Sequence, residues 1–378
     1  MGALAVITVA TLICGCAQSQ AKNTGTWNPQ AAAHYLDQRE AWWMGWQGAA
    51  RDHGTFCISC HTALPYALSR AALRGALHED APTIEETKFL DDVRKRVRLW
   101  NEIGTYYSDQ ENGAYKTVES RGTEAVLNAL VLASHDAGQG RLSKVTRTAF
   151  DNMWAVQLRT GDQQGAWWWL QFGLRPWEAK DSQYYGAALA ALAVGMAPEN
   201  YRATPEIQDN LKLLRGYLDR EYATQALHNR VVLLWASTKL PGLIDPDLQK
   251  SIVKDIFDEQ RADGGWSLSS LNRTWKGSTL HSYVRSWIRE DGTLVQSESD
   301  GYATGLVAFV LQEAGTPREN PQLEHGLSWL KLHQNKKEGL WTAYSLNDRR
   351  RPSSNIGHFM SDAATAYASL ALTDASRR

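Results

Sequence analysis

One short pattern recurs along the chain of 378 residues, and it constrains the fold more than any other feature. A helix-like stretch ends near Gln, a polar turn containing Gly follows, and an aromatic residue then precedes an Ala- and Gly-rich stretch. The four copies occupy residues 109–115, 163–167, 260–266 and 334–341, and their aromatic residues are 52, 99 and 75 residues apart. One unit is therefore near 50 residues, with a degenerate copy in the longest interval and an insertion in the last. A period of this length is typical of proteins built from stacked helical or stranded units.

The apolar periodicity between these turns predicts helices only, arranged as six pairs of an outer and an inner helix. The inner helices are nearly free of charge, as residues 184–192 show, which indicates that they are buried on all sides. We therefore expect an all-α protein, a single closed ring of helical hairpins of the (α/α)6 toroid type. The expected pairs, outer helix first, are 30–49 with 64–78, 84–103 with 120–137, 143–159 with 181–196, 204–220 with 224–239, 246–260 with 300–315, and 320–334 with 358–373.

These turns resemble the Q-W motifs of the squalene-hopene and oxidosqualene cyclases, most strongly at 260–266 and 334–341. The resemblance covers roughly residues 84–373 and implies the α/α toroid of the terpenoid cyclase and protein prenyltransferase superfamily. In that family the turns are structural, which implies a packing role for Trp167, Trp266 and Trp341. Two departures count against the family's activities. The proton-donating D-x-D-D motif has only residues 298–301 as a counterpart, and the repeat region has no cysteine for a prenyltransferase zinc.

Residues 57–61 read Cys-Ile-Ser-Cys-His, the C-x-x-C-H spacing at which haem is attached covalently to a polypeptide. Cys57 and Cys60 would add to the haem vinyl groups, and His61 would bind the iron as the proximal ligand. We therefore expect one covalent haem c. Two alternatives use the same residues. A zinc site would take both thiolates and His61, with His53 as the fourth ligand, and a thioredoxin-like pair would use the thiols alone, although no βαβ pattern surrounds them.

The sixth coordination position of that iron has three candidates nearby in the sequence, Met44, His53 and His78. Each is equally compatible with an ordinary packed or solvated side chain. The haem would be carried by the first hairpin of the ring, without an autonomous cytochrome fold. Three aromatic residues just upstream are candidates for its walls, with ordinary helix packing as the alternative: Trp42, Trp43 and Trp46.

The N-terminal segment predicts export from the cytoplasm. Residues 2–13 form an apolar run that is too short to span a bilayer and is placed like the core of a signal peptide. The run ends in a sequence that resembles a bacterial lipobox, with Cys16 as the lipidated mature N-terminus; secretion with cleavage nearby is the alternative. The protein would lie in the periplasm or at the outer surface, attached to the membrane by its lipid anchor only. The expected segments are a signal peptide (1–16), a linker (17–29), the haem-attachment hairpin (30–82) and the toroid repeats (83–378).

Polar residues near the starts of the inner helices are candidates for a ligand or catalytic cavity at the mouth of the ring. They are Glu124, Asp181, His228, Asp300 and Asp362. Asp is also a good N-cap residue, so Asp181, Asp300 and Asp362 have the alternative role of satisfying helix N–H groups.

The formal net charge is −1 and no large cluster of Lys and Arg is present, so nucleic-acid binding is not indicated. The sequence favours an exported c-type haem protein that acts in electron transfer or haem-based redox chemistry with a periplasmic redox partner. The first alternative is an enzyme acting on an apolar, terpenoid-like molecule in the ring cavity. The second is a non-catalytic scaffold whose Cys/His site holds zinc or nothing.

Overall fold

The computed structural model describes residues 26–103, 113–273 and 287–377. Over these ranges the protein is all-α, as the sequence predicts, with thirteen α-helices and one hairpin in which β1 (Ala50–Arg51) pairs antiparallel with β2 (Thr55–Phe56). The helices are α1 (Pro29–Gly45), α2 (Ala63–Leu77), α3 (Ile84–Arg98), α4 (Gly113–Ala137), α5 (Lys144–Ala155), α6 (Ser182–Met196), α7 (Gln208–Glu221), α8 (Leu227–Lys239), α9 (Pro246–Asp258), α10 (Leu268–Leu271), α12 (Gly301–Glu313), α13 (Pro321–His333) and α14 (Phe359–Arg377).

Every expected helix has a counterpart in the structure, with both ends within five residues of the prediction in all but one. The exception is α4, which begins at Gly113 and not near residue 120. Capping residues set several of the starts. The side chains of Asn28, Ser143 and Asp245 accept hydrogen bonds from N–H groups in the first turns of α1, α5 and α9. Thr83 forms a reciprocal capping box with Glu86 at the start of α3.

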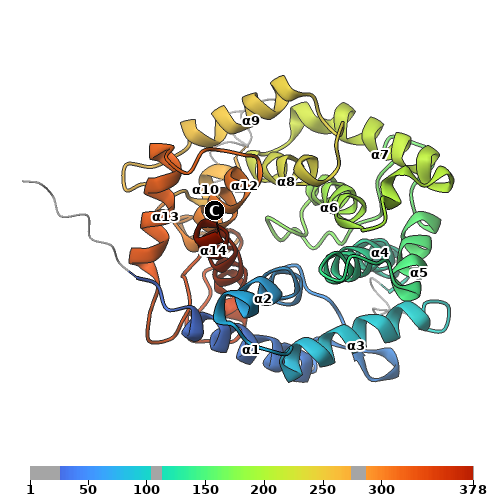
Figure 1. Ribbon diagram of the computed structural model, residues 1–378, viewed down its shortest axis with the longest axis horizontal. Helices are drawn as coiled ribbons and strands as arrows, with labels where there is room; N and C mark the ends of the chain where they lie inside the picture. Colours follow the sequence, from blue (N-terminus) through green and yellow to red (C-terminus); the bar gives the residue numbers. More distant parts are fainter. Residues whose placement is uncertain (1–25, 104–112, 274–286, 378) are drawn as a thin grey trace, which may run out of the picture.

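Six helices contact one another in succession, namely α2, α4, α6, α8, α12 and α14, and α14 contacts α2 in turn. Figure 1 shows these six around the centre of the molecule, with α1, α3, α5, α7, α9 and α13 outside them. Small residues permit the close contacts of the inner helices. A Cβ atom on Gly305 of α12, for example, would lie only 2.5 Å from the backbone nitrogen of Ala368 in α14.

The predicted pairing of outer with inner helices holds for α1 with α2 and for α3 with α4, but it differs for the later outer helices. The outer helices α5, α7 and α9 pack mainly against the inner helix that precedes them, which is α4, α6 and α8 respectively. The predicted pairs joined each outer helix to the inner helix that follows it. The connections explain part of the difference, because short turns join α4 to α5 and α8 to α9, whereas long segments separate α5 from α6 and α9 from α12.

Three of the repeated turns share one set of hydrogen bonds, 2.7 to 3.1 Å long. In each, a Gln amide donates to the carbonyl of the turn glycine and to a backbone carbonyl at or near the start of another outer helix. The Trp indole donates to a carbonyl of the outer helix just before the turn. In the first turn, Gln157 donates to the carbonyls of Gly165 and Asn210, and Trp167 donates to that of Met153. In the second, Gln260 donates to the carbonyls of Gly264 and Gln322, and Trp266 donates to that of Ile256. In the third, Gln334 donates to the carbonyls of Gly339 and Asn28, and Trp341 donates to that of Leu330.

The last of these turns connects the two ends of the described chain. Gln334 donates to the Asn28 carbonyl at 3.0 Å and accepts from the Asn28 N–H at 2.6 Å, across 306 residues of sequence. Gly339 must be glycine, because its φ is +84° and a Cβ atom would lie 2.0 Å from the Ala31 carbonyl oxygen. The start of α1 is therefore held by the turn that follows α13.

The structure also corrects two details of the repeat. In the copy at 163–167 the Gln that forms the shared hydrogen bonds is Gln157, just beyond the end of α5, and not Gln163 or Gln164. In the first copy, residues 109–112 lie outside the described residues, and Tyr115 is 62% exposed in the first turn of α4. Tyr115 is thus not a buried counterpart of Trp167, Trp266 and Trp341, each of which is at most 1% exposed.

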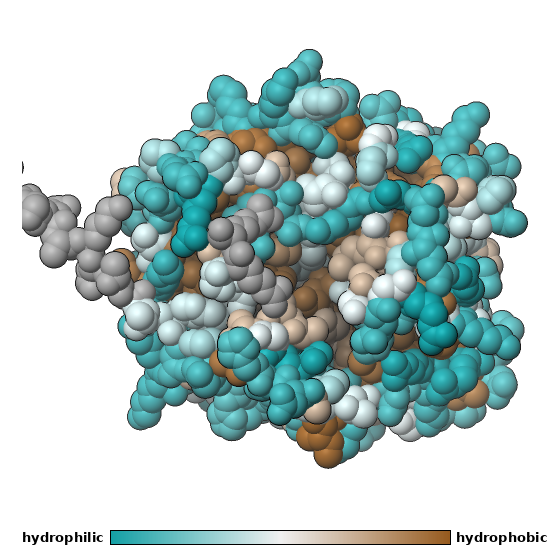
Figure 2. Space-filling model, viewed as in Figure 1, coloured by the Kyte–Doolittle hydropathy of each residue, from teal (hydrophilic) through white to brown (hydrophobic). Residues whose placement is uncertain are grey.

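Hydrophilic residues cover most of the face seen in Figure 2, and hydrophobic residues are visible in a hollow near its middle. In the part of the chain that the structure describes, no helix is long and apolar enough to cross a bilayer.

Candidate haem-attachment site

The C-x-x-C-H segment lies in the loop between strand β2 and helix α2, and hydrogen bonds fix both of its ends. The Cys57 N–H donates to the Ala49 carbonyl at 2.9 Å. At the other end, Ser59 Oγ accepts from the N–H groups of Thr62 at 3.1 Å and Ala63 at 3.0 Å. Ser59 therefore caps α2, and the segment enters the helix in a defined conformation.

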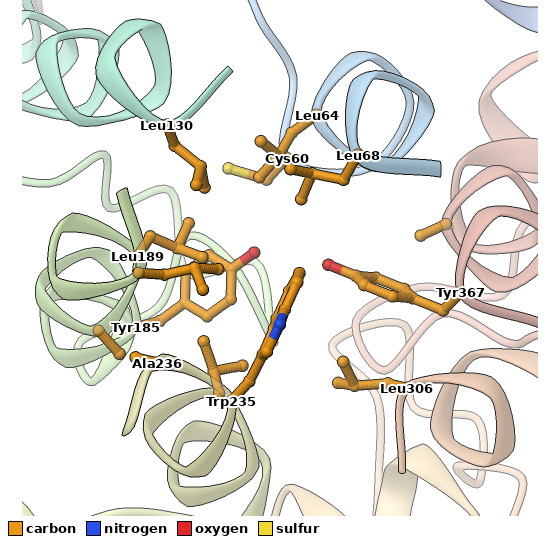
Figure 3. Close-up of a cluster of buried hydrophobic side chains, with 14 of the residues drawn as sticks. Cys60, Leu64, Leu68, Leu130, Tyr185, Leu189, Trp235, Ala236, Leu306 and Tyr367 are labelled. Atoms are coloured by element: carbon orange, nitrogen blue, oxygen red, sulfur yellow. The ribbon is translucent and has the colours of Figure 1, made fainter. Parts of the chain in front are cut away.

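Both cysteines are free thiols in apolar surroundings. Cys57 is half-buried and Cys60 is buried, with its sulfur beside Leu64 and facing Leu130 (Figure 3). Burial raises the pKa of Cys57 to about 11 and raises the pKa of Cys60 as well. Both thiols are therefore protonated at neutral pH. A thiol–disulfide catalyst needs a thiolate, so this environment counts against the thioredoxin-like alternative.

The two ring nitrogens of His61 have different surroundings. Nδ1 lies 2.8 Å from the hydroxyl oxygen of Thr62, whereas Nε2 makes no hydrogen bond with the described residues. Burial, and secondarily the charge of Arg39, lowers the pKa of His61 to about 3. The imidazole is thus neutral at neutral pH, as a ligand to iron must be.

Aromatic rings surround this imidazole. Phe359, the first residue of α14, stacks on it with ring centroids 3.7 Å apart, and Trp43 meets it edge-on at 5.0 Å. Trp42 and Trp46 are stacked at 5.2 Å and lie within 6.2 Å of Phe359. The three tryptophans singled out in the sequence therefore form one cluster with the ring of His61. Phe359 completes the cluster from the far end of the chain, and no sequence pattern marks it.

The sixth-ligand candidates lie in three different settings. His78 caps the C-terminal end of α2, about 22 Å along the helix axis from the start of α2, by the rise of an α-helix. Since both axial ligands bind one iron atom, this placement excludes His78 as a partner of His61. His53 is exposed in the turn between β1 and β2, with Nδ1 3.2 Å from a carboxylate oxygen of Asp52. Met44 is half-buried near the end of α1.

Met44 lines a surface hollow of about 530 Å³ between α1, the β-hairpin and α3. Its other lining residues include Phe56 and Asp92, but none of Cys57, Cys60 and His61. This hollow is therefore a neighbour of the candidate site and not the site itself. The zinc alternative gains no support either, because among the described residues no three His, Cys, Asp or Glu side chains converge as a metal site.

Of the five cavity candidates, only Asp362 is brought to the C-x-x-C-H segment. It is buried in α14 and accepts hydrogen bonds from Tyr35, Arg39 and Thr62 at 2.7 Å each. Thr62 is also the hydrogen-bond partner of His61. A helix-capping role for Asp362, which the sequence left open, is not its main one, because these three side chains take up its carboxylate.

The other four candidates each have local partners. Asp300 is the N-cap of α12, its carboxylate accepting from the N–H groups of Ala303 at 2.9 Å and Leu268 at 2.6 Å, so its capping alternative is correct. Glu124 forms a two-pronged ion pair with Arg96. Asp181 occupies the N-cap position of α6 without a capping hydrogen bond, and its carboxylate accepts from the side-chain amide of Asn229 at 3.4 Å.

His228 belongs to a buried aromatic group near the centre. Its Nε2 is 2.8 Å from the Tyr302 hydroxyl oxygen, and the same hydroxyl accepts from the Trp177 indole at 3.2 Å. Burial lowers the pKa of His228 to about 4, so its ring is neutral at neutral pH. These contacts give His228 a full set of neighbours inside the protein.

One further buried donor at the centre was not singled out in the sequence. The Trp235 indole N–H has no hydrogen-bond partner among the described residues, although Trp235 is only 3% exposed. Figure 3 shows its side chain directed toward the middle, where Leu189, Leu306 and the side chains of Tyr185 and Tyr367 also meet; the hydroxyls of these two tyrosines interact with each other. An unpaired donor in apolar surroundings is costly, so the Trp235 N–H can take an additional acceptor.

Comparison with models of known protein families gives no match, and comparison with curated proteins gives none. The assignment therefore depends on the residues themselves. Three features are compatible with a covalently bound haem: two free thiols at C-x-x-C spacing, a neutral imidazole with an unpaired Nε2, and an aromatic cluster around that imidazole. Cys16, the predicted lipidation site, lies outside the described residues.

Proposed function

We propose that this chain is a c-type haem protein that acts in electron transfer or haem-based redox chemistry. Cys57 and Cys60 would hold the macrocycle and His61 would bind the iron through Nε2. The observation that carries the proposal is the state of His61. Its Nδ1 is engaged by Thr62, its Nε2 is unpaired, and its ring is neutral and lies between aromatic side chains. When bound, the haem would supply a one-electron couple whose potential depends on this axial ligand.

The proposed scaffold is an (α/α)6 toroid similar to that of the terpenoid cyclases. Two observations support this scaffold. The six inner helices contact one another in succession, with α14 returning to α2, and three turns share the same Gln and Trp hydrogen bonds. The proposed location is the periplasm or the outer surface, with a lipid anchor at Cys16 and a periplasmic redox partner. The support for that location is the apolar run with its lipobox-like end, together with the C-x-x-C-H motif, whose haem is attached outside the bacterial cytoplasm.

The test is expression in a host that matures c-type haem, followed by a reduced pyridine haemochrome spectrum and an intact mass. We expect a c-type spectrum and a mass increase of one haem in the wild-type chain, and neither in a Cys57→Ala/Cys60→Ala variant. His78→Ala is the matched control, since His78 is exposed and does not belong to the motif; this variant should retain the haem. A wild-type protein that carries zinc or no metal after the same expression would overturn the proposal and leave the scaffold alternative.

A second candidate function is favoured by the unpaired Trp235 donor at the centre. An enzyme acting on an apolar, terpenoid-like molecule there would place one acceptor oxygen of the molecule against the Trp235 indole N–H. Thermal shift measurements with farnesol and with squalene test this idea, because only farnesol carries an oxygen. Farnesol should stabilise the wild-type protein more than a Trp235→Phe variant, whereas squalene should not distinguish them. An equal farnesol shift in both proteins would exclude this role for Trp235.

The coordination of the haem iron separates the two functions. A six-coordinate, low-spin iron favours simple electron transfer, and an exchangeable sixth position favours an enzyme. Met44 and His53 are the remaining candidates for the sixth ligand, and the spectra of Met44→Ala and His53→Ala variants would show which of them, if either, binds.

A further inference from the structure

We propose that Asp362 is a positioning residue for His61, acting through the hydroxyl of Thr62. This inference rests on the proposed role of His61 as an iron ligand. Two consecutive hydrogen bonds join helix α14 to the C-x-x-C-H segment, one of 2.7 Å from Thr62 to Asp362 and one of 2.8 Å between Thr62 and His61.

The direction of the two hydrogen bonds follows from the surroundings of Asp362. Arg39 donates to both carboxylate oxygens, at 2.7 and 3.0 Å, and the Tyr35 hydroxyl donates at 2.7 Å. A carboxylate that accepts from a guanidinium in this two-pronged way is ionised and has no proton of its own to donate. The hydroxyl of Thr62 must therefore donate its single proton to Asp362. Toward His61 it can only accept, so Nδ1 carries the proton and the lone pair of the ring is on Nε2.

Thr62 is available for this role because another residue caps the helix. Thr62 occupies the N-cap position of α2, where a threonine hydroxyl would ordinarily accept from an N–H of the first turn. Here it makes no such hydrogen bond, and Ser59 Oγ accepts from the Thr62 and Ala63 N–H groups. The capping function and the contact with His61 are thus divided between the two hydroxyl residues of the loop.

Two consequences follow for a bound iron. The hydrogen bond at Nδ1 fixes the tautomer in which Nε2 is free to bind, so the ring is pre-set for ligation. A hydroxyl that is itself bound to a carboxylate is a stronger acceptor, and a stronger acceptor at Nδ1 makes the imidazole a more basic ligand. A more basic axial ligand favours ferric over ferrous iron, so the hydrogen bond from Nδ1 to Thr62 would lower the reduction potential of a bound haem.

The test uses Thr62→Val, which keeps the shape of the side chain and removes the hydroxyl, and Thr62→Ser, which keeps the hydroxyl. Neither variant alters the Arg39–Asp362 ion pair. In the haem-free, ¹⁵N-histidine-labelled full chain, the nitrogen shifts of His61, assigned with a His61→Gln variant, report the tautomer. We expect the Nδ1–H form in wild type and in Thr62→Ser, and a mixture or the Nε2–H form in Thr62→Val.

In the haem-loaded chain, Thr62→Val should raise the ferrous-to-ferric ratio at a fixed solution potential about tenfold, a rise in potential of about 59 mV for one electron. Thr62→Ser should restore the wild-type value, and Asp362→Asn, if it folds, should change the ratio in the same direction as Thr62→Val. An unchanged tautomer and an unchanged potential in Thr62→Val would overturn the inference. A chain that takes up no haem would instead contradict the proposed function, and the tautomer measurement would still decide the role of Thr62.

Discussion

The contact between Gln334 and Asn28 predicts a definite loss of stability when Gln334 is replaced by Ala. The side chain donates to the carbonyls of Asn28 and Gly339 and accepts from the Asn28 N–H, so three hydrogen bonds are removed. At about 1 kcal/mol each, the variant should lose about 3 kcal/mol of unfolding free energy. Gln334 is buried, so water does not readily replace these bonds.

Thermal unfolding gives the corresponding shift in Tm. An unfolding entropy of about 2.1 cal/mol/K per residue gives about 0.7 kcal/mol/K for the roughly 350 residues of the fold, so 3 kcal/mol corresponds to a decrease of about 4 °C. The matched control is Gln164→Ala. Gln164 belongs to the repeat as the sequence defines it, but its side chain makes one hydrogen bond, to the Arg159 carbonyl, in an exposed turn. We expect this control to change Tm by less than about 1 °C.

The comparison of the two variants decides whether the last turn holds the start of α1. A Gln334→Ala variant with the Tm of wild type, or with the same small change as Gln164→Ala, would refute the reasoning. So would a loss of equal size in both variants, because the effect would then belong to the repeat pattern and not to the contact with Asn28.

Three further predictions concern single residues. Gly339→Ala should lose about 2–4 kcal/mol of unfolding free energy, since the φ of residue 339 is +84° and the new Cβ would meet the Ala31 carbonyl. Gly216→Ala in α7, with open space around it, should gain up to about 1 kcal/mol. Urea unfolding of both variants checks these opposite signs. Asp300→Ala should lose about 2 kcal/mol by the same assay, because the N–H groups of Ala303 and Leu268 lose their acceptor, and Asp300→Asn should recover part of the loss. The pKa of His228 is lowered to about 4 in the folded protein, so between that value and about 6.5 the unfolded chain binds more protons and stability is lost as the pH falls. His228→Gln should reduce this pH slope by up to about 1.4 kcal/mol per pH unit, and identical slopes in the two proteins would contradict the assignment.

The positions of the helices could be predicted because their signals are local. The inner helices have long runs without charge, such as residues 184–192, and Gly and Pro fall between the helices. The inner-helix neighbours of α5, α7 and α9 could not be predicted, because apolar periodicity marks a buried face and does not identify the neighbour that covers it. Gln157 was missed for a related reason. It lies eight residues before its turn glycine, whereas Gln260 and Gln334 lie four and five residues before theirs.

The site was predictable only where its residues are adjacent in sequence. The spacing of Cys57, Cys60 and His61 identifies the motif directly, and Trp43 lies close enough upstream to be considered. Asp362 was considered as an N-cap or a cavity acid, but its link to Thr62 crosses 300 residues, and no local pattern reports it. Trp235 lies in an apolar helix, where a residue with an unpaired polar atom looks like any other core residue until its neighbours are known.

The most direct measurement of the central claim is the mass of the tryptic peptide that carries the motif. Cleavage after Arg51 and Arg70 releases residues 52–70, which contain Cys57, Cys60 and His61. After expression with c-type haem maturation, this peptide should carry the mass of one haem, retained under denaturing conditions, while the peptides of the repeat region remain unmodified. An unmodified 52–70 peptide, recovered with two free thiols from the same host, would contradict the account.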